Sequence, residues 1–460
     1  MLPGLTRDRA AAGGDLRAAI RGGGGSSCAG KRMDVFAGFT NISRFPLDRF
    51  SSNAQILQKI DGSLGVIACF ILTIFRRIGD ALGSGPGGEK PRNVLFLKLA
   101  EQGSTVLAHE AIRQAVERFG ARNVYFLLFE ENRFILDLLG LVPPENVLTI
   151  QTKSPVTMVT SCLSRLVDIR RLGIESCIDM EFFARSTAAL AWLTGARVRA
   201  GFHGYFGEGP YRGDLLTHRV LYNSHLHTSS TFTSLVMALD GDAEKFPTFP
   251  VSPPATVAPP LFEPAAEERL VIEKMLQGLK SPGHDRLILL NANASDLLPL
   301  RKWNETNYIV LAQRLLEEFD DISIGFTGGP DESAKVEELV RLVGSPRCFC
   351  LAGKTTLRQL LIVYGFSEIL VTNDSGPAHF ATLTTMDVVT LFGPETPLLF
   401  GAPTPRNHAL WAGIACSPCV NALNNRQTAC RDNVCMKMIT VDQVFETVCR
   451  VHRQRKSQLK

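Results

Sequence analysis

Short apolar runs alternate with longer amphipathic segments along two stretches of this chain. In the first stretch, the runs 93–100, 124–129 and 177–180 predict buried strands, with helices at 105–119 and 132–139. Strands separated by helices of this length indicate a parallel, doubly wound sheet. The second stretch repeats the pattern, with strands expected at 287–292, 322–328, 348–353, 368–373 and 388–393 and helices at 305–318, 332–342 and 357–364.

The two stretches are separated by residues 246–264, in which proline recurs. Proline favours extended backbone and removes amide donors, so this segment is expected to be an interdomain linker. The chain has 460 residues and is 45% apolar, which is enough for two cores. We therefore expect an α/β protein with two Rossmann-like domains, 92–245 and 265–460, facing across a cleft. Ligands of such sheets bind at the carboxyl ends of the strands.

The region before residue 92 has a different composition. Residues 1–60 are expected to be a largely disordered extension, because Gly, Ala, Arg and Ser dominate its first part. Residues 61–91 contain the apolar run 63–75, closed by Arg76 and Arg77, and then a Gly/Pro-rich linker. The run is shorter than the ~20 residues that span a bilayer. A membrane-surface anchor and a packing helix fit it about equally, and a signal peptide core fits it less well.

Charge and cysteine content exclude some classes of protein. The chain carries 49 basic and 45 acidic residues, a balance that does not favour a nucleic-acid partner. Its 11 cysteines are too sparse for a secreted disulfide scaffold. A reducing compartment fits best.

The sharpest motif is NDSGPAH, residues 373–379, directly after a predicted strand. Asp374 or Ser375 can cap the helix that follows, and Gly376 allows close approach to the backbone. Pro377 suits the first turn, and His379 comes about one turn into the helix. Free amides at a helix start bind anions, so the motif predicts a phosphate site.

Two other strand ends carry polar residues. Arg301 and Lys302 follow the strand at 287–292, and their cations could neutralise a departing diphosphate. Asp331 and Glu332 follow a pair of glycines, and either carboxylate could accept hydrogen bonds from ribose or a base. Gly-Gly-Pro-Asp is also the composition of an ordinary turn, which is the alternative for this second group.

Three segments, LAGKTTLRQL (351–360), EILVTNDSGPAHFA (368–381) and VVTLFGPETPLLFG (388–401), resemble the carboxyl-terminal signature of glycosyltransferase family 9, in the same order. The family comprises bacterial heptosyltransferases of lipopolysaccharide, and the resemblance covers about residues 92–450. It implies a GT-B fold whose second domain binds the nucleotide diphosphate of an ADP-sugar. It also implies a donor site made of Ser295, Arg301, Asp331, Asp374, Ser375, Gly376 and His379.

In this family the region resembling 193–203 faces the acceptor. The surrounding segment, 178–229, is dense in polar residues, and its arginines could bind an anionic glycolipid. A long exposed loop with unrelated charges is an equal alternative. The residues predicted to bind the acceptor are Arg185, Arg199, His203 and Arg212.

The catalytic base is where this sequence departs from the family. Inverting transfer needs a carboxylate within reach of the acceptor hydroxyl. The family usually places an aspartate just after the glycine that follows the first strand, but here that residue is Ser104. Glu101 stands two residues before the glycine, and we assign it the role of base; the alternative is a solvated loop glutamate in an inactive or repurposed site.

Four cysteines, Cys416, Cys419, Cys430 and Cys435, have a spacing that could hold zinc. Only one pair has the tight two-residue spacing, so packed thiols are favoured, and neither a metal nor a cofactor is predicted.

The resemblance implies an inverting glycosyltransferase that moves a heptose-like sugar from a nucleotide-diphospho-sugar to a lipopolysaccharide core or related glycolipid. The expected partners are that donor, the glycolipid and the cytoplasmic face of the inner membrane, with no nucleic acid. A sugar-nucleotide epimerase or hydrolase and a non-catalytic sugar-nucleotide-binding protein are the alternatives.

Overall fold

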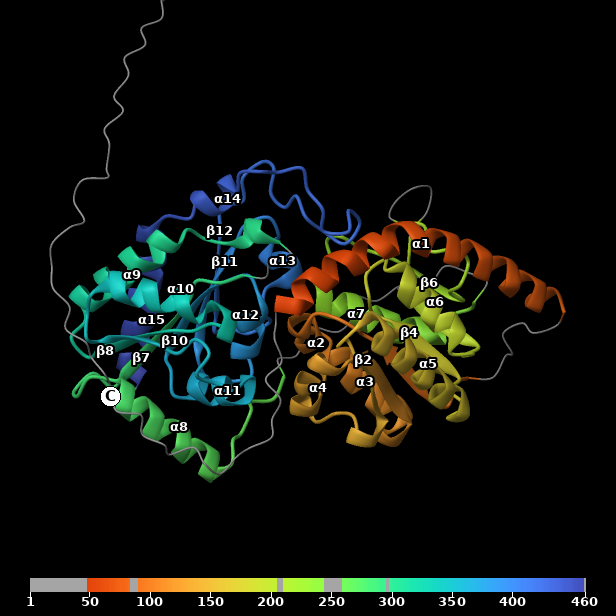
Figure 1. The fold of residues 1–460 in the computed structure, drawn as a ribbon, viewed down its shortest axis with the longest axis horizontal. Helices are drawn as coiled ribbons and strands as arrows, with labels where there is room; N and C mark the ends of the chain where they lie inside the picture. Colours follow the sequence, from red (N-terminus) through yellow and green to blue (C-terminus); the bar gives the residue numbers. More distant parts are fainter. Residues whose placement is uncertain (1–47, 83–89, 205–209, 244–258, 295–297, 459–460) are drawn as a thin grey trace, which may run out of the picture. The chain divides into compact units, whose positions relative to one another are not determined.

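The computed structural model describes residues 48–82, 90–204, 210–243, 259–294 and 298–458, with side chains from residue 61 onward. All of these residues belong to one unit, Pro46–Lys460. They form two parallel six-stranded sheets (Figure 1). Most of the linker predicted at 246–264, and most of the extension predicted at 1–60, lie outside the described residues.

The first sheet has the order β3-β2-β1-β4-β5-β6, and every neighbouring pair is parallel. Helices α5 and α6 pack on one face and α3 and α7 on the other. The strands are β1 (Val94–Leu97), β2 (Val124–Phe129), β3 (Val147–Ile150), β4 (Ser176–Asp179), β5 (Val198–His203) and β6 (His218–Leu221). The helices are α2 (Gln102–Leu107), α3 (His109–Phe119), α4 (Arg133–Leu139), α5 (Pro155–Arg171), α6 (Arg185–Leu193) and α7 (Thr228–Met237).

The second sheet has the order β12-β11-β10-β7-β8-β9 and is also wholly parallel. Its strands are β7 (Arg286–Asn291), β8 (Ile322–Phe326), β9 (Cys348–Cys350), β10 (Ile369–Asn373), β11 (Asp387–Phe392) and β12 (Asn407–Trp411). The helices are α8 (Ala266–Leu279), α9 (Glu305–Glu318), α10 (Ser333–Val343), α11 (Leu357–Gly365), α12 (Gly376–Ala381), α13 (Pro397–Phe400), α14 (Val434–Lys437) and α15 (Val441–Gln458).

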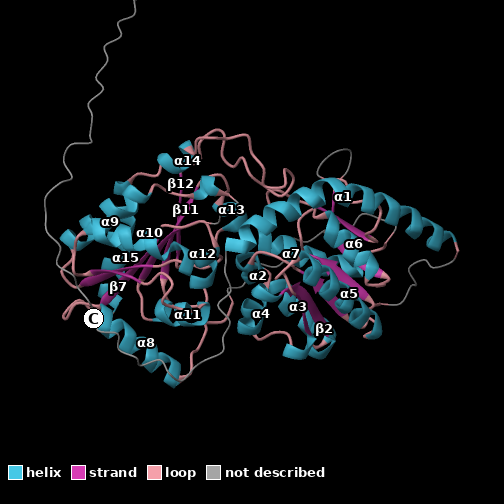
Figure 2. Cartoon of the chain, in the orientation of Figure 1, coloured by secondary structure: helices cyan, strands magenta, loops and turns pink. Residues whose placement is uncertain are grey.

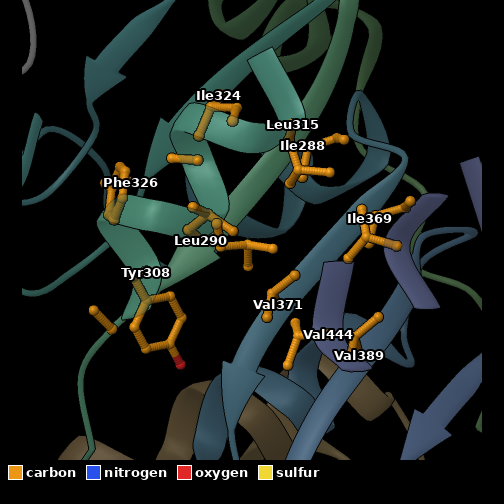
Figure 3. Close-up of a cluster of buried hydrophobic side chains, with 14 of the residues drawn as sticks. Ile288, Leu290, Tyr308, Leu315, Ile324, Phe326, Ile369, Val371, Val389 and Val444 are labelled. Carbon is orange, nitrogen blue, oxygen red and sulfur yellow. The ribbon is translucent and has the colours of Figure 1, made fainter. Parts of the chain in front are cut away.

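Both sheets are buried because helices cover both of their faces (Figure 2). Apolar side chains from successive strands of the second sheet meet helices α9 and α15 in one cluster (Figure 3). Ile288, Ile324 and Val371 in this cluster are completely buried. Strands with two covered faces are expected to be almost continuously apolar, as the sequence is.

The helix before the first sheet is longer than the sequence predicted. Helix α1 runs from Asp48 to Ala81, so residues 48–60, which we assigned to a disordered extension, are helical. Within it, Asp61–Ala81 is long and apolar enough to cross a membrane. One face of α1 nevertheless packs on α6, where Cys69 is completely buried beside Ala188 and Leu215.

Candidate active site

The candidate base, Glu101, occupies a strained turn between β1 and α2. Its φ is 66° and its ψ is 82°, in the left-handed region that residues other than Gly, Asn and Asp rarely adopt. Its carboxylate receives two contacts. Ser104 Oγ lies 3.3 Å from Oε2, and Arg426 Nη1 forms an ion pair with Oε1. A third of the side chain is exposed, so Glu101 can reach solvent or a ligand.

A buried lysine supports the same turn. Lys98 is 1% exposed, and its Nζ donates to Ala100 O at 2.6 Å and to Glu181 Oε1 at 3.1 Å. Glu181 also accepts a hydrogen bond from Ala100 N at 2.9 Å. Burial lowers the pKa of Lys98 and the Glu181 carboxylate opposes that effect. This network holds the backbone immediately before Glu101.

The second sheet contributes a buried charged cluster at the carboxyl ends of β10 and β11. Arg301 Nη2 pairs with Glu395 Oε2, and Arg301 Nε lies 3.7 Å from Asp374 Oδ2. Glu395 is 1% exposed and Asp374 3% exposed. Burial raises the pKa of Glu395 to about 8, although the Arg301 cation opposes the shift. His379 is also buried, and burial lowers its pKa to about 4.

Several polar atoms of this cluster are buried without a hydrogen-bond partner among the described residues. They are Arg301 Nε, Asp374 Oδ2, His379 Nδ1 and Glu395 Oε1. Buried polar atoms are nearly always paired, so four in one cluster indicate a place where a ligand or water completes the bonding. The predicted residues Arg301, Asp374 and His379 are therefore brought together.

The start of α12 differs in detail from the prediction. Ser375 stands at the N-cap position, but its Oγ donates to Asn373 O at 3.1 Å and caps no amide. Asp374 does not cap the helix either; its side chain lies beside Arg301 instead. Gly376 begins the helix, and a Cβ there would touch the Phe380 ring at 3.4 Å. The expectation that one of these two side chains caps α12 was wrong.

Helix α12 also meets α2 from the first half of the chain. A Cβ added to Gly103 would lie 2.7 Å from His379 Cδ2 and 3.5 Å from Gly376 Cα. Only a residue without a side chain allows this approach. The turn that carries Glu101 and the NDSGPAH motif are therefore neighbours.

Other predicted donor-site residues lie outside this cluster. Lys302 is half-buried next to Arg301, and its backbone oxygen accepts a hydrogen bond from Asn433 Nδ2 at 2.9 Å. Asp331 is exposed in the short turn after β8, whereas the neighbouring Glu332 accepts from Gly329 N at 2.7 Å. Ser295 lies outside the described residues.

Two of the predicted acceptor-binding arginines, Arg199 and Arg212, are buried and make contacts within the first domain. Arg212 is 2% exposed and pairs with the fully buried Asp179. Arg199 is 8% exposed and donates to Leu215 O at 2.7 Å. Both therefore stabilise the fold, and the expectation that they form an anion-binding surface was wrong.

The other two predicted acceptor residues are partly accessible. Arg185 donates to Tyr211 O at 2.8 Å, and its Nη1 lies 3.8 Å from Asp61 Oδ2 of α1. His203 ends β5 and is half-buried, and burial lowers its pKa. An acceptor role for these two stays a prediction.

Among the described residues, no group of three or more His, Cys, Asp or Glu side chains is arranged to hold a metal ion. Cys416, Cys419, Cys430 and Cys435 are free thiols, and Cys435, in α14, is the buried one.

Sequence reasoning missed Glu395, Arg426 and Lys98. Glu395 lies three residues after the end of β11, so the rule that ligands bind at strand ends could have found it. Lys98 follows β1 directly. Arg426 lies in a long loop between β12 and α14, where no local pattern marks it.

Two Rossmann-like parallel sheets in one chain, with a polar cluster at the carboxyl edge of the second, define the GT-B class of glycosyltransferase fold. The family described as Glycosyltransferase family 9 (heptosyltransferase) matches residues 169–429. The chain belongs to this family.

Individual relatives match over shorter lengths. Lipopolysaccharide heptosyltransferase 2 of Salmonella typhimurium is 34% identical over 101 residues, which are 22% of this chain and 29% of that protein. Lipooligosaccharide heptosyltransferase 2 of Campylobacter jejuni is 25% identical over 169 residues, 35% of this chain and 50% of that protein. The alignments thus span half or less of these relatives.

Solved structures share the fold over greater lengths. Escherichia coli ADP-heptose lipopolysaccharide heptosyltransferase II has a TM-score of 0.59 at 16% identity, covering 79% of this chain and 99% of that one. A family 9 glycosyltransferase from Veillonella parvula has the same TM-score and identity, and the match covers 78% of this chain and 97% of that one.

Proposed function

We propose that this protein is an inverting glycosyltransferase that moves a heptose-like sugar from a nucleotide-diphospho-sugar, ADP-linked, to a lipopolysaccharide core or related glycolipid. The observation that carries the proposal is the close approach of Gly103 to His379. This approach brings Glu101, at the end of the first sheet, next to the buried polar atoms of the second sheet that lack a hydrogen-bond partner. Family membership supports sugar transfer, and solved heptosyltransferases of E. coli hold ADP and an ADP-2-deoxy-2-fluoro heptose.

The donor diphosphate is proposed to bind at the start of α12. Arg301 supplies a cation beside it, Lys302 follows Arg301 in the chain, and the amides of the first turn add hydrogen bonds. As the bond to the anomeric carbon breaks, negative charge develops on the leaving diphosphate. Fixed cations in a buried cluster stabilise that charge more than water would, because they need not reorganise.

Glu101 is proposed to take the proton from the acceptor hydroxyl as its oxygen attacks the anomeric carbon. The attack comes from the face opposite the diphosphate, so the configuration at that carbon inverts. Glu101 is suited to this role because its carboxylate is partly exposed and held by Ser104 and Arg426.

Helix α1 is proposed to hold the enzyme on the cytoplasmic face of the inner membrane. Its outer face carries large apolar side chains that are 45% to 61% exposed, namely Leu64, Ile67, Phe70, Ile71, Ile74, Phe75 and Ile78. Its inner face is fixed to the domain, since Arg76 Nη1 lies 2.8 Å from Asp214 Oδ1. Residues packed on the domain cannot also cross a bilayer, so α1 is proposed to lie in the interface.

A second apolar stripe supports this location. Val156, Val159, Leu163 and Val167 of α5 follow helical spacing and are 48% to 71% exposed. The exposed Arg170 and Arg171 end this helix, and basic residues at such a place favour anionic lipid.

The proposed activity is tested by incubating the full chain with ADP-heptose, with and without a heptose-deficient lipopolysaccharide acceptor. We expect ADP release and acceptor glycosylation only when both substrates are present. ADP release without acceptor would indicate a hydrolase instead. Binding of ADP-heptose without turnover in either mixture would indicate a protein that has lost catalysis.

A further inference from the structure

A loop from the second half of the chain reaches into the first half. We call residues 416–430, between β12 and α14, the crossing loop. It is held to the second sheet where β11 ends, because Ser417 Oγ donates to Gly393 O at 2.5 Å and Cys419 N donates to Pro394 O at 3.0 Å. Further along, Ala422 is 3% exposed within the core cluster of the first sheet. The loop therefore joins the two halves next to the candidate site.

The crossing loop brings Arg426 to Glu101. Arg426 Nη1 pairs with Glu101 Oε1, and Arg426 Nε lies 3.5 Å from Glu395 Oε1. The guanidinium carbon also lies 5.5 Å from the centre of the Phe400 ring. Since Glu395 pairs with Arg301, a chain of charged contacts runs from the candidate diphosphate site to the candidate base.

The backbone on both sides of this contact is strained. Four residues other than glycine have a positive φ in the described part of the chain. Three of them are Glu101 at 66°, Asn425 at 52° and Arg426 at 54°, and Glu101 and Arg426 are ion-pair partners. Strained conformations persist where surrounding contacts hold them, and they concentrate at functional sites. The strain on both partners indicates that their meeting is specified by the fold.

We propose that Arg426 is a positioning residue that orients the carboxylate of Glu101 for proton transfer. Arg426 holds Oε1, and Ser104 Oγ touches Oε2, so the carboxylate is confined to one rotamer. Oε2 keeps a lone pair for the acceptor proton. This inference rests on the proposed function, because it takes Glu101 to be the base.

The test compares Arg426→Gln, Arg426→Lys and the matched control Arg453→Gln. Arg453 is an exposed arginine of α15 whose Nη2 pairs with Glu318 of α9, and in the described part of the chain it forms no ion pair with Glu101 or Glu395. We expect Arg426→Gln to lower kcat about tenfold to a hundredfold, because a small misplacement of a catalytic group is enough for such a loss. The KM for ADP-heptose and the melting temperature of Arg426→Gln should stay near the wild-type values. Arg426→Lys should recover part of the lost kcat, and the control Arg453→Gln should keep the wild-type kcat.

The decisive measurement is a double-mutant cycle in kcat. Because Arg426 acts through Glu101, adding Arg426→Gln to Glu101→Gln should cause no further loss. Losses that multiply, or a wild-type kcat for Arg426→Gln, would overturn the proposal.

A second readout does not need turnover. Carbodiimide labels accessible carboxylates, and peptide mapping measures the extent of labelling at Glu101. We expect Glu101 to be labelled faster in Arg426→Gln than in wild type or Arg453→Gln. If wild type transfers no sugar, the proposed function fails, and an unchanged labelling rate would separately refute the positioning role.

Discussion

Glu395 and Arg301 form an ion pair at the carboxyl edge of the second sheet, where Glu395 is 1% exposed. Asp374 lies beside the same arginine. Two carboxylates thus share one buried cation from the loop after β7, and burial raises the pKa of Glu395 to about 8. A site of this kind can take up or release a proton near neutral pH.

Glu395→Gln tests this raised pKa. A carboxyl whose pKa rises from 4.5 in the unfolded chain to about 8 in the folded one gives stability that is complete below pH 4.5. That stability is lost as pH rises to 8, because the folded form binds the proton more tightly. The free energy of unfolding of wild type, measured in urea, should therefore fall between pH 5 and pH 8 by on the order of a few kcal/mol more than that of Glu395→Gln. A difference that does not change with pH would show that Glu395 is ionised throughout.

Glu101→Gln keeps the size and hydrogen bonding of the side chain but removes the base. Turnover should fall about a hundredfold to ten-thousandfold, the usual contribution of general-base catalysis, and ADP affinity should stay near wild type. Steady-state kinetics and calorimetric titration with ADP measure the two effects. Unchanged turnover would exclude Glu101 as the base.

Gly376→Val tests the proposed diphosphate site. The added side chain starts in contact with the Phe380 ring and extends over the first turn of α12. We expect ADP affinity to fall at least tenfold, measured by titration calorimetry. The matched control is Gly278→Val in α8, where a Cβ meets nothing within 4 Å. If both variants bind ADP as wild type does, the diphosphate binds elsewhere.

Introducing negative charge on the exposed face of α1 tests whether this face binds the membrane. Phe70→Glu and Ile74→Glu change side chains that are 58% and 46% exposed. Both variants should fold normally and lose most binding to anionic lipid vesicles in a flotation assay, because a buried carboxylate in the interface is costly. Undiminished flotation of the double variant would exclude this face as the membrane contact.

A change on the opposite face of α1 is the control. Cys69 is completely buried against α6, so Cys69→Ser should lower the melting temperature without a specific loss of lipid binding. Removing residues 1–80 would expose Ala188 and Leu215, so that truncation should destabilise the first domain.

The sequence alone predicted three strands of the first sheet (β1, β2 and β4) and five of the second (β7 to β11), but not β3, β5, β6 or β12. The strands at 287–292 and 368–373 were predictable because a strand covered on both faces needs an uninterrupted apolar run, which is a local property. The NDSGPAH motif was placed correctly at a strand end for the same reason. The proximity of this motif to Arg301 was also predictable, because both follow parallel strands and ligands bind at the carboxyl edge of such strands.

Only the tertiary structure decided how the charged side chains are used. Arg199 and Arg212 look like surface cations in the sequence, yet the fold buries them against backbone oxygens and Asp179. Arg426 and Glu101 are 325 positions apart, and no local pattern relates them. A charge acquires its role from its burial and its partner, and both depend on contacts between segments distant in the chain.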